Sequence, residues 1–229
     1  TGTVSTGTLN VGDDISSEGA TGVNNDLGVK DLDFSSNSGT VDASVTISND
    51  TGLTLVGDGS SELLKGTGSN NTVTVGSNSD SAGTLTLGNA AAESSGGTLN
   101  ANVTLQSDSQ MTVEAGSFTV DKITATEGTV AVNAGADLTT MQDFTVGDAI
   151  NNKTGTIDAA GSITAGKVDL QQGTVAVTGS LTANELSVGP SKKEGTVTAA
   201  GTVDVGTLNL NRGKVEVTGA LAAETLTVA

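Results

Sequence analysis

Apolar residues in the C-terminal third of the chain recur at the same six offsets in four consecutive rows. The rows are Ile157, Ala159, Ile163, Ala165, Val168 and Leu170; Val175, Val177, Leu181, Ala183, Leu186 and Val188; Val197, Ala199, Val203, Val205, Leu208 and Leu210; and Val215, Val217, Leu221, Ala223, Leu226 and Val228. Each row opens with a glycine and carries a second one six residues later, giving Gly155 and Gly161, Gly173 and Gly179, Gly195 and Gly201, and Gly213 and Gly219. The opening glycines are 18, 22 and 18 residues apart. Because alternate side chains of a strand face opposite sides, each row predicts three short strands separated by tight bends.

Repetition of the same columns favours a coil over an antiparallel meander, since only a coil requires one fixed row with glycine at the same two bends. In a coil each row stacks on the previous one at about 4.8 Å, so equivalent aliphatic residues form one continuous core. The fold class predicted is all-β, a right-handed parallel β-helix with three short strands per turn of about 18–22 residues. A left-handed coil is the alternative, but it demands a strict six-residue repeat. Here the extra residues of the longest row lie in one bend, 189–194.

The pattern extends toward the N-terminus with less regularity. Residues 111–125 and the segment that opens at Gly128 fit further rows, with Phe118 and Phe144 predicted inward. Residues 39–50 closely parallel residues 97–108, at an offset of 58 residues that we interpret as about three rows. Val4 to Val11 is expected to form a partial row, and Leu32 and Phe34 to return to the core. We therefore expect a single solenoid domain over 1–229, less regular in 1–108 and regular in 109–229.

Composition changes this picture little, but charge limits the partners. Gly, Thr and Ser are abundant and Phe occurs only three times. This composition also suits a disordered segment, an alternative that the regular rows argue against. The chain has 9 basic and 26 acidic residues and a net charge of −17, which disfavours nucleic acid as a partner. No apolar run is long enough to insert directly into a membrane.

Two stretches carry a resemblance to a known group of proteins: GTVAVTGSLTANELSV at 173–188 and ANVTLQSDSQMTVEAGSFTV at 101–120. They resemble the passenger domains of type V autotransporters, particularly AIDA-type adhesins, and related bacterial surface β-helix proteins. The resemblance implies export through an outer-membrane barrel and a role in cell adhesion and bacterial aggregation. It also implies a secreted or cell-surface location and the possibility of sugars on Ser or Thr. The barrel sequence of that family is not present among these residues.

The residue inventory removes most catalytic systems. His, Cys, Tyr and Trp do not occur, so imidazole- and thiol-based nucleophiles and metal sites are excluded. What remains is the chemistry of polysaccharide lyases and hydrolases, which uses paired Asp or Asp with a basic residue. Three pairings are candidates: Asp31 with Asp33, Asp158 with Asp169, and Asp204 with Arg212. Such a pair needs a defined separation and one raised pKa, which nothing in the sequence indicates. We interpret these residues as solvated outward charges and predict a non-enzyme without catalytic, cofactor or metal residues.

Two further patterns are weak. Oxygen-rich segments at 13–14 and 57–62 could approach calcium, but they lack the nonapeptide repeat of calcium-binding β-rolls. Four segments match the N-linked acceptor pattern, at Asn49, Asn70, Asn102 and Asn152. In a chain this rich in Ser and Thr such matches arise by chance, so neither pattern predicts a site.

The functional expectation therefore depends on the surface. The last row has no polar capping segment, and an open coil exposes strand edges that recruit another chain. We expect either flanking sequence from a longer protein or end-to-end stacking into a filament. The function predicted is a non-catalytic extracellular adhesin, self-association segment or fibre subunit. It would act through lateral contact along outward Thr, Asn and Asp ladders, or through display of loops 12–31, 57–71 or 147–154 to a host or bacterial surface ligand. A carbohydrate-active β-helix enzyme and a passive spacer are the alternatives.

Overall fold

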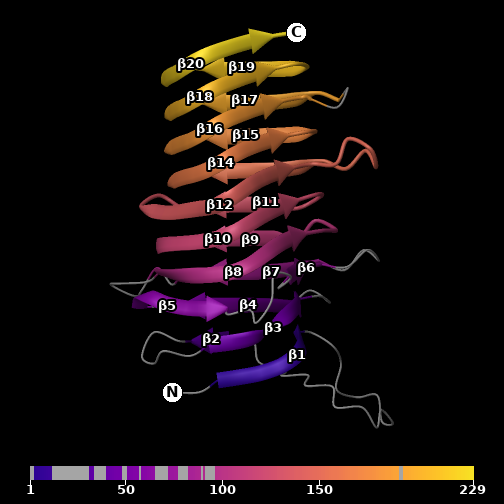
Figure 1. Cartoon of the computed structure of the whole chain (residues 1–229), viewed down its shortest axis with the longest axis vertical. Helices are drawn as coiled ribbons and strands as arrows, with labels where there is room; N and C mark the ends of the chain where they lie inside the picture. Colours follow the sequence, from indigo (N-terminus) through magenta and orange to yellow (C-terminus); the bar gives the residue numbers. More distant parts are fainter. Residues whose placement is uncertain are drawn as a thin grey trace.

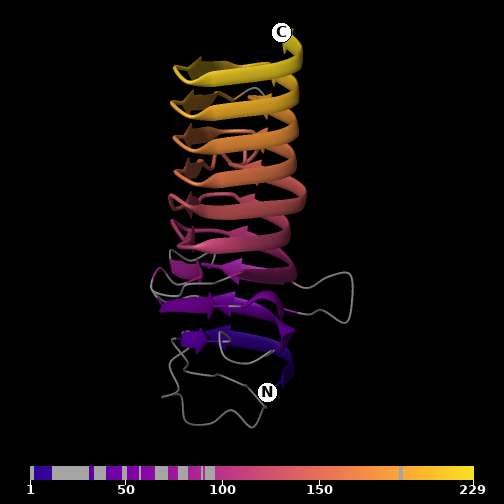
Figure 2. The ribbon, with the colours of Figure 1, turned by 90° about the vertical axis from the view of Figure 1, so that its left-hand side faces the viewer.

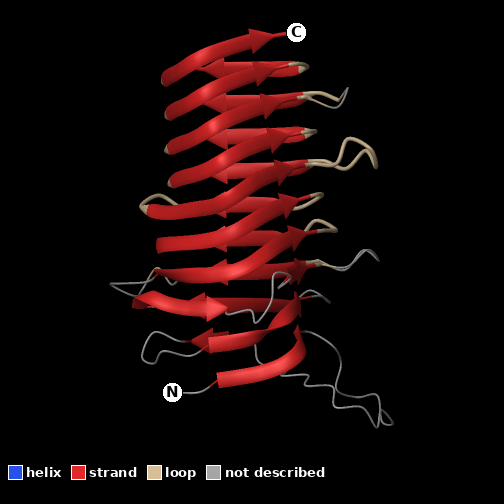
Figure 3. Ribbon diagram, viewed as in Figure 1, coloured by secondary structure: helices blue, strands red, loops and turns tan. Residues whose placement is uncertain are grey.

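The computed structural model describes residues 3–11, 31–33, 40–47, 51–56, 58–64, 72–76, 82–88, 90, 96–190 and 193–229. Side chains are described for 45–47, 52–55 and, within those same ranges, from 72 onward. Every regular element in these ranges is a β-strand, as Figure 3 shows. No helix there could span a membrane. The all-β prediction is confirmed.

The strands form two parallel sheets that alternate along the chain. The nine-stranded sheet contains the short strands β2 (Asp31–Asp33), β4 (Thr51–Val56), β7 (Gly83–Leu87), β9 (Gln110–Val113), β11 (Thr129–Val132), β13 (Gly155–Ala159), β15 (Gly173–Val177), β17 (Gly195–Ala199) and β19 (Gly213–Val217). The eleven-stranded sheet contains β1 (Thr3–Val11), β3 (Thr40–Ile47), β5 (Asp58–Leu64), β6 (Thr72–Val75), β8 (Gly96–Leu105), β10 (Gly116–Ala125), β12 (Ala136–Val146), β14 (Ser162–Leu170), β16 (Ser180–Val188), β18 (Thr202–Leu210) and β20 (Ala220–Val228). We call them the short-strand sheet and the long-strand sheet.

One short and one long strand make one turn of a coil. From β9 to β20 this gives six regular turns stacked along one axis (Figure 1). In Figure 1 the long strands cross the front from left to right while the chain climbs from the N-terminus to the C-terminus. The short strands return behind them, and Figure 2 shows the connecting face between the two. The fold is therefore a right-handed parallel β-helix.

The predicted columns form the core. Ile163, Leu181 and Val203 are paired neighbours on successive long strands, and each is at most 1% exposed. The predicted inward aromatic residues Phe118 and Phe144 are also fully buried. In the last described turn Leu226 and Val228 follow the same column but are 62% and 68% exposed, because none of the described residues stacks on that side of the core.

The structure differs from the prediction in the number of strands per turn. The second and third predicted strands of each row join into one long strand that bends in the middle. In β14 the inward residues change phase between Ala165 and Val168, and the pairing with β16 skips Gly166. The bend keeps the backbone hydrogen-bonded on both sides of the corner, so two apolar faces are made by one continuous strand.

The N-terminal half also needs one correction. The two copies of the 58-residue repeat are two turns apart and not three, because Val45 pairs with Val73 and Val73 pairs with Val103. Each of these turns carries long connections, so fewer turns consume the same length of chain. The partial row at 4–11 is confirmed as β1. Leu32 lies in β2, whereas Phe34 lies outside the described residues.

Candidate interaction surface

The corner within each long strand decides which residues face outward. Beyond the corner of β14, Val168 and Leu170 point into the core, so Lys167 and Asp169 point out. The same two outward positions repeat on the strands of this sheet from β6 to β20, the part whose side chains the structure describes. They form two parallel columns on one face, which we call the outer face of the long-strand sheet.

The first of these columns alternates in charge. Asp143 pairs with Lys167, and Lys167 pairs with Glu185. On the side of β10, Ile123 pairs with Phe144. Lys122 directly precedes Ile123 and Asp143 directly precedes Phe144, so Lys122 and Asp143 are also neighbours. We call these four residues the charged column: Lys122, Asp143, Lys167 and Glu185. They lie on successive strands at about 4.8 Å, with signs plus, minus, plus and minus.

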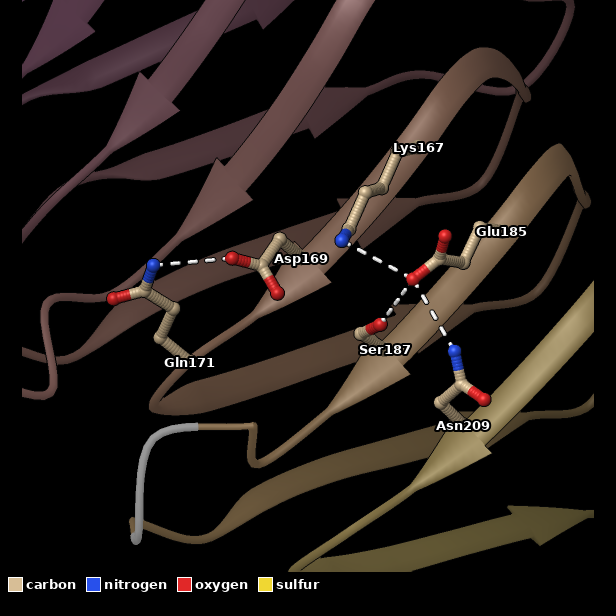
Figure 4. Close-up of polar contacts among 6 residues, drawn as sticks. All are labelled: Lys167, Asp169, Gln171, Glu185, Ser187 and Asn209. Carbon is tan, nitrogen blue, oxygen red and sulfur yellow. Dashed lines mark hydrogen bonds and ion pairs between the residues drawn. The ribbon is translucent and has the colours of Figure 1, made fainter. Parts of the chain in front are cut away.

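Glu185 is the best-connected member of the column (Figure 4). Its Oε1 lies 3.1 Å from Lys167 Nζ and accepts hydrogen bonds from Ser187 Oγ at 2.7 Å and Asn209 Nδ2 at 3.2 Å. The hydrogen bonds from Ser187 and then from Lys167 hold the pKa of Glu185 below its usual value. The two side chains of the ion pair are 37% and 35% exposed, so solvent weakens the attraction but the carboxylate stays charged at neutral pH.

Lys167 faces acidic groups on three strands. Its hydrogen bond to Glu185 raises its pKa above the usual value, and the charges of Asp169 and Asp143 add to the effect. Asp169 is itself held by Gln171, whose Nε2 donates to Oδ2 at 3.0 Å. Within the charged column, Lys167 and Glu185 thus form one hydrogen-bonded ion pair, and Asp143 adds its charge from the neighbouring strand.

The second outward column of this face is polar and mostly neutral. It contains Thr74, Thr104, Thr124, Thr145, Asp169, Ser187, Asn209 and Thr227. Most of these residues are short and β-branched or hydroxylated, which suits a flat sheet surface. The face therefore offers a row of charges beside a row of hydroxyl and amide groups, which is interrupted at Ser187, only 4% exposed.

A second candidate feature is the loop 147–154, which is confirmed as a projecting connection between β12 and β13. Asp148 and Lys153 exchange backbone hydrogen bonds at 2.9 Å, and Asp148 Oδ1 accepts from the backbone N–H groups of Ile150 and Asn151. Lys153 forms an ion pair with Glu127 in the preceding turn. Asn152 accepts from Lys193 Nζ at 2.7 Å. The loop is therefore fixed to the turns on both sides of it.

A polar cavity of about 350 Å³ lies under this loop. Its lining combines carboxylate, amide, hydroxyl and ammonium groups and consists of Gln106, Ser107, Thr126, Glu127, Asp148, Asn151 and Lys153. The Lys153 ammonium and the Glu127 carboxylate already neutralise each other there. The cavity is a polar recess beside a display loop, and the two carboxylates of its lining are held by Lys153 and by backbone N–H groups of the loop.

The structure separates one of the three predicted pairings, Asp158 with Asp169. Asp158 lies on β13 of the short-strand sheet and Asp169 on β14 of the long-strand sheet, so the two point from different faces. Among the described residues no ion pair joins Asp204 to Arg212. Asp31 and Asp33 bound β2, but their side chains lie outside the described part of the chain.

The weaker sequence patterns fall partly outside the described residues. Residues 13–14 lie outside them, and the side chains of 57–62 are not described. In the described ranges no group of three or more acidic side chains could hold a metal ion. Of the N-linked acceptor pattern, Asn102 lies on β8 and Asn152 in the loop 147–154, while Asn49 and Asn70 lie outside.

Sequence reasoning missed the charged column, although its signal was present. Lys167 and Glu185 each lie 12 residues after the glycine that opens their row, and so do Thr207 and Thr225. Aligning the outward offsets as carefully as the inward ones would have placed these two charges side by side.

Comparisons with known proteins give no relative: no family model, no curated protein and no solved structure matches this chain.

Proposed function

We propose that this chain is an extracellular β-solenoid displayed on a bacterial surface, where it acts without catalysis in adhesion and self-association. The observation that supports the proposal is the outer face of the long-strand sheet. It is long, straight and lined in register by charged, hydroxyl and amide groups. A surface of this kind suits many weak contacts made in parallel, as contact between cells requires.

Repetition makes such a face effective. Each turn adds the same two outward positions, so affinity grows with the number of turns in contact while each contact stays weak and reversible. The net charge of −17 keeps isolated molecules apart at a distance. An arrangement that brings opposite charges together opposes this repulsion at close range.

The test is display of the chain on a non-aggregating bacterial host through an unrelated outer-membrane anchor. We expect cells to settle and clump at about 0.1 M salt, where a Debye length of about 10 Å screens the long-range repulsion, and the clumps to disperse as the salt concentration rises and the Debye length falls below about 5 Å. Cells that carry the anchor alone are the control. If the folded chain on the surface produces neither clumping nor binding to host surfaces, the proposal is wrong.

A further inference from the structure

The order of positive and negative residues along the charged column is inverted in sign when the column is read in the opposite direction. Read from β10 to β16 its signs are plus, minus, plus and minus, for Lys122, Asp143, Lys167 and Glu185. Read in the opposite direction they are minus, plus, minus and plus. The column is therefore complementary to its own reversed copy.

We propose that the partner of this face is a second copy of the chain, packed face to face with its axis reversed, about a two-fold axis that passes between β12 and β14. In this arrangement Lys122 lies opposite Glu185 of the second copy, and Asp143 lies opposite Lys167. The contact is isologous, so each pair occurs twice. Every charge of the column then faces an opposite charge across the interface as well as along its own sheet.

The neighbouring positions agree with the same two-fold axis. On the first column Asn102 meets Thr207 and Thr72 meets Thr225. On the second column the solvent-accessible pairs are Thr145 with Asp169, Thr104 with Asn209, and Thr74 with Thr227. Each of these solvent-accessible pairs can form a hydrogen bond, and none places two like charges together. Thr124 lies over Ser187, which is only 4% exposed and donates its hydroxyl to Glu185, so this position contributes packing and no hydrogen bond.

A parallel pairing with strands in register has the opposite result. It places Lys167 against Lys167 and Glu185 against Glu185, and like charges in contact oppose association. The reversed arrangement is thus selected by electrostatics. It also suits molecules on two different cells, because their axes point toward each other.

The size of the face predicts a weak contact. Eight strands at about 4.8 Å and four residues at about 3.3 Å each give roughly 34 Å by 13 Å, or about 450 Å² per molecule. The total of about 900 Å² falls in the range of weak, transient complexes. Stable clumping then requires many copies on each cell, in agreement with the proposed function, on which this inference rests.

The decisive variant inverts the column without changing its composition: Lys122→Glu, Asp143→Lys, Lys167→Glu and Glu185→Lys together. Signs still alternate along the sheet and the net charge is unchanged, so we expect the variant to fold. The inverted column is again complementary to a reversed copy of itself. Packed against a reversed copy of the original column, it places like charges opposite each other. Cells that display the original chain are labelled with one colour, and cells that display the inverted chain with another. Each population should clump with itself, and contacts between the two colours should be more than about tenfold rarer than contacts within one colour.

A matched control inverts an ion pair on the other sheet. Lys214 and Glu216 lie on β19, with Nζ and Oε1 2.6 Å apart. The double variant Lys214→Glu with Glu216→Lys should mix freely with the original. Circular dichroism and thermal unfolding of each purified variant confirm that it is folded.

Cross-linking tests the direction of packing. The chain contains no cysteine, so an introduced pair reports only its own contact. Asn102→Cys and Thr207→Cys lie five strands apart, roughly 24 Å, within one molecule, but they are opposite each other in the reversed pair. Oxidation of a mixture of the two single variants should give a disulfide-linked heterodimer at least about tenfold above either variant alone.

The outcomes separate the two proposals. Free mixing of original and inverted cells, or cross-links within each single variant and none between them, overturns the reversed two-fold contact while clumping itself still supports self-association. Absence of clumping in the original and in every folded variant overturns the reversed two-fold contact, and absence of binding to host surfaces as well overturns the proposed function.

Discussion

The carbonyl oxygen of Gly161 occupies the space that a side chain at position 179 would need: a Cβ built on Gly179 would lie 2.1 Å from it. The same contact repeats one turn later, where a Cβ on Gly201 would lie 1.9 Å from the oxygen of Gly179. Stacked turns bring backbone against backbone at this corner. The glycine column in the sequence is therefore a steric requirement of the coil.

Substitution of this glycine should be costly. Gly179→Ala must push two turns apart or shift the corner, which we expect to lower the free energy of unfolding by about 1–3 kcal/mol. Gly166→Ala is the matched control, because the nearest atom to its Cβ would be 3.5 Å away. It should be neutral or stabilising by about 0.4–1 kcal/mol. Denaturant unfolding of both variants measures the difference, and equal stability would contradict the steric explanation.

Core and surface positions of one strand should differ sharply in how much stability is lost on substitution by alanine. Leu181 is fully buried, whereas its neighbour Thr182 faces solvent on the same strand. Leu181→Ala leaves a cavity between turns and should cost about 2–5 kcal/mol. Thr182→Ala should stay within about 0.5 kcal/mol of the original. Chemical denaturation tests both, and a small effect of Leu181→Ala would show that the turns close over the gap.

Much of the fold could be predicted because one row determines the next. Inward Val, Leu and Ile at fixed offsets specify the register, and glycine specifies the corners where backbones touch. The long strand was predicted as two because the change of phase between Ala165 and Val168 resembles a turn. Sequence alone does not show that hydrogen bonding continues on both sides of that corner.

The surface was harder to predict than the core. Outward positions are not constrained by packing, so their pattern varies from row to row and draws less attention. The proximity of Lys167 and Glu185 depends on the lateral pairing of β14 with β16. Asp158 and Asp169 looked close in sequence but belong to different sheets, because the corner between β13 and β14 turns the chain onto another face.

The order of the loop 147–154 should depend on Asp148. Its carboxylate accepts hydrogen bonds from two backbone N–H groups and, at 2.6 Å, from Nδ2 of Asn151. Asp148→Ala removes all three bonds, so the amides of Ile150 and Asn151 should exchange with solvent faster while global stability changes by less than about 0.5 kcal/mol. Asp158→Ala, an outward change on β13, is the control. Unchanged exchange in Asp148→Ala would show that the links to Glu127 and Lys193 are sufficient.

Stability should depend on pH through the ion pair of Lys167 and Glu185. The pKa of Glu185 is lowered from 4.5, chiefly by the hydrogen bond from Ser187, so its contribution is present above about pH 4.5 and is lost as pH falls through the lowered value. The pKa of Lys167 is raised from 10.5 by Glu185, so its contribution is lost only as pH rises through the raised value. NMR titration of Glu185 should show its pKa moving up toward 4.5 in Ser187→Ala. Between pH 7 and pH 3 the free energy of unfolding of Glu185→Gln should change less than that of the original. An unshifted Glu185 titration in the original would show that this pair is too well solvated to order the outer face.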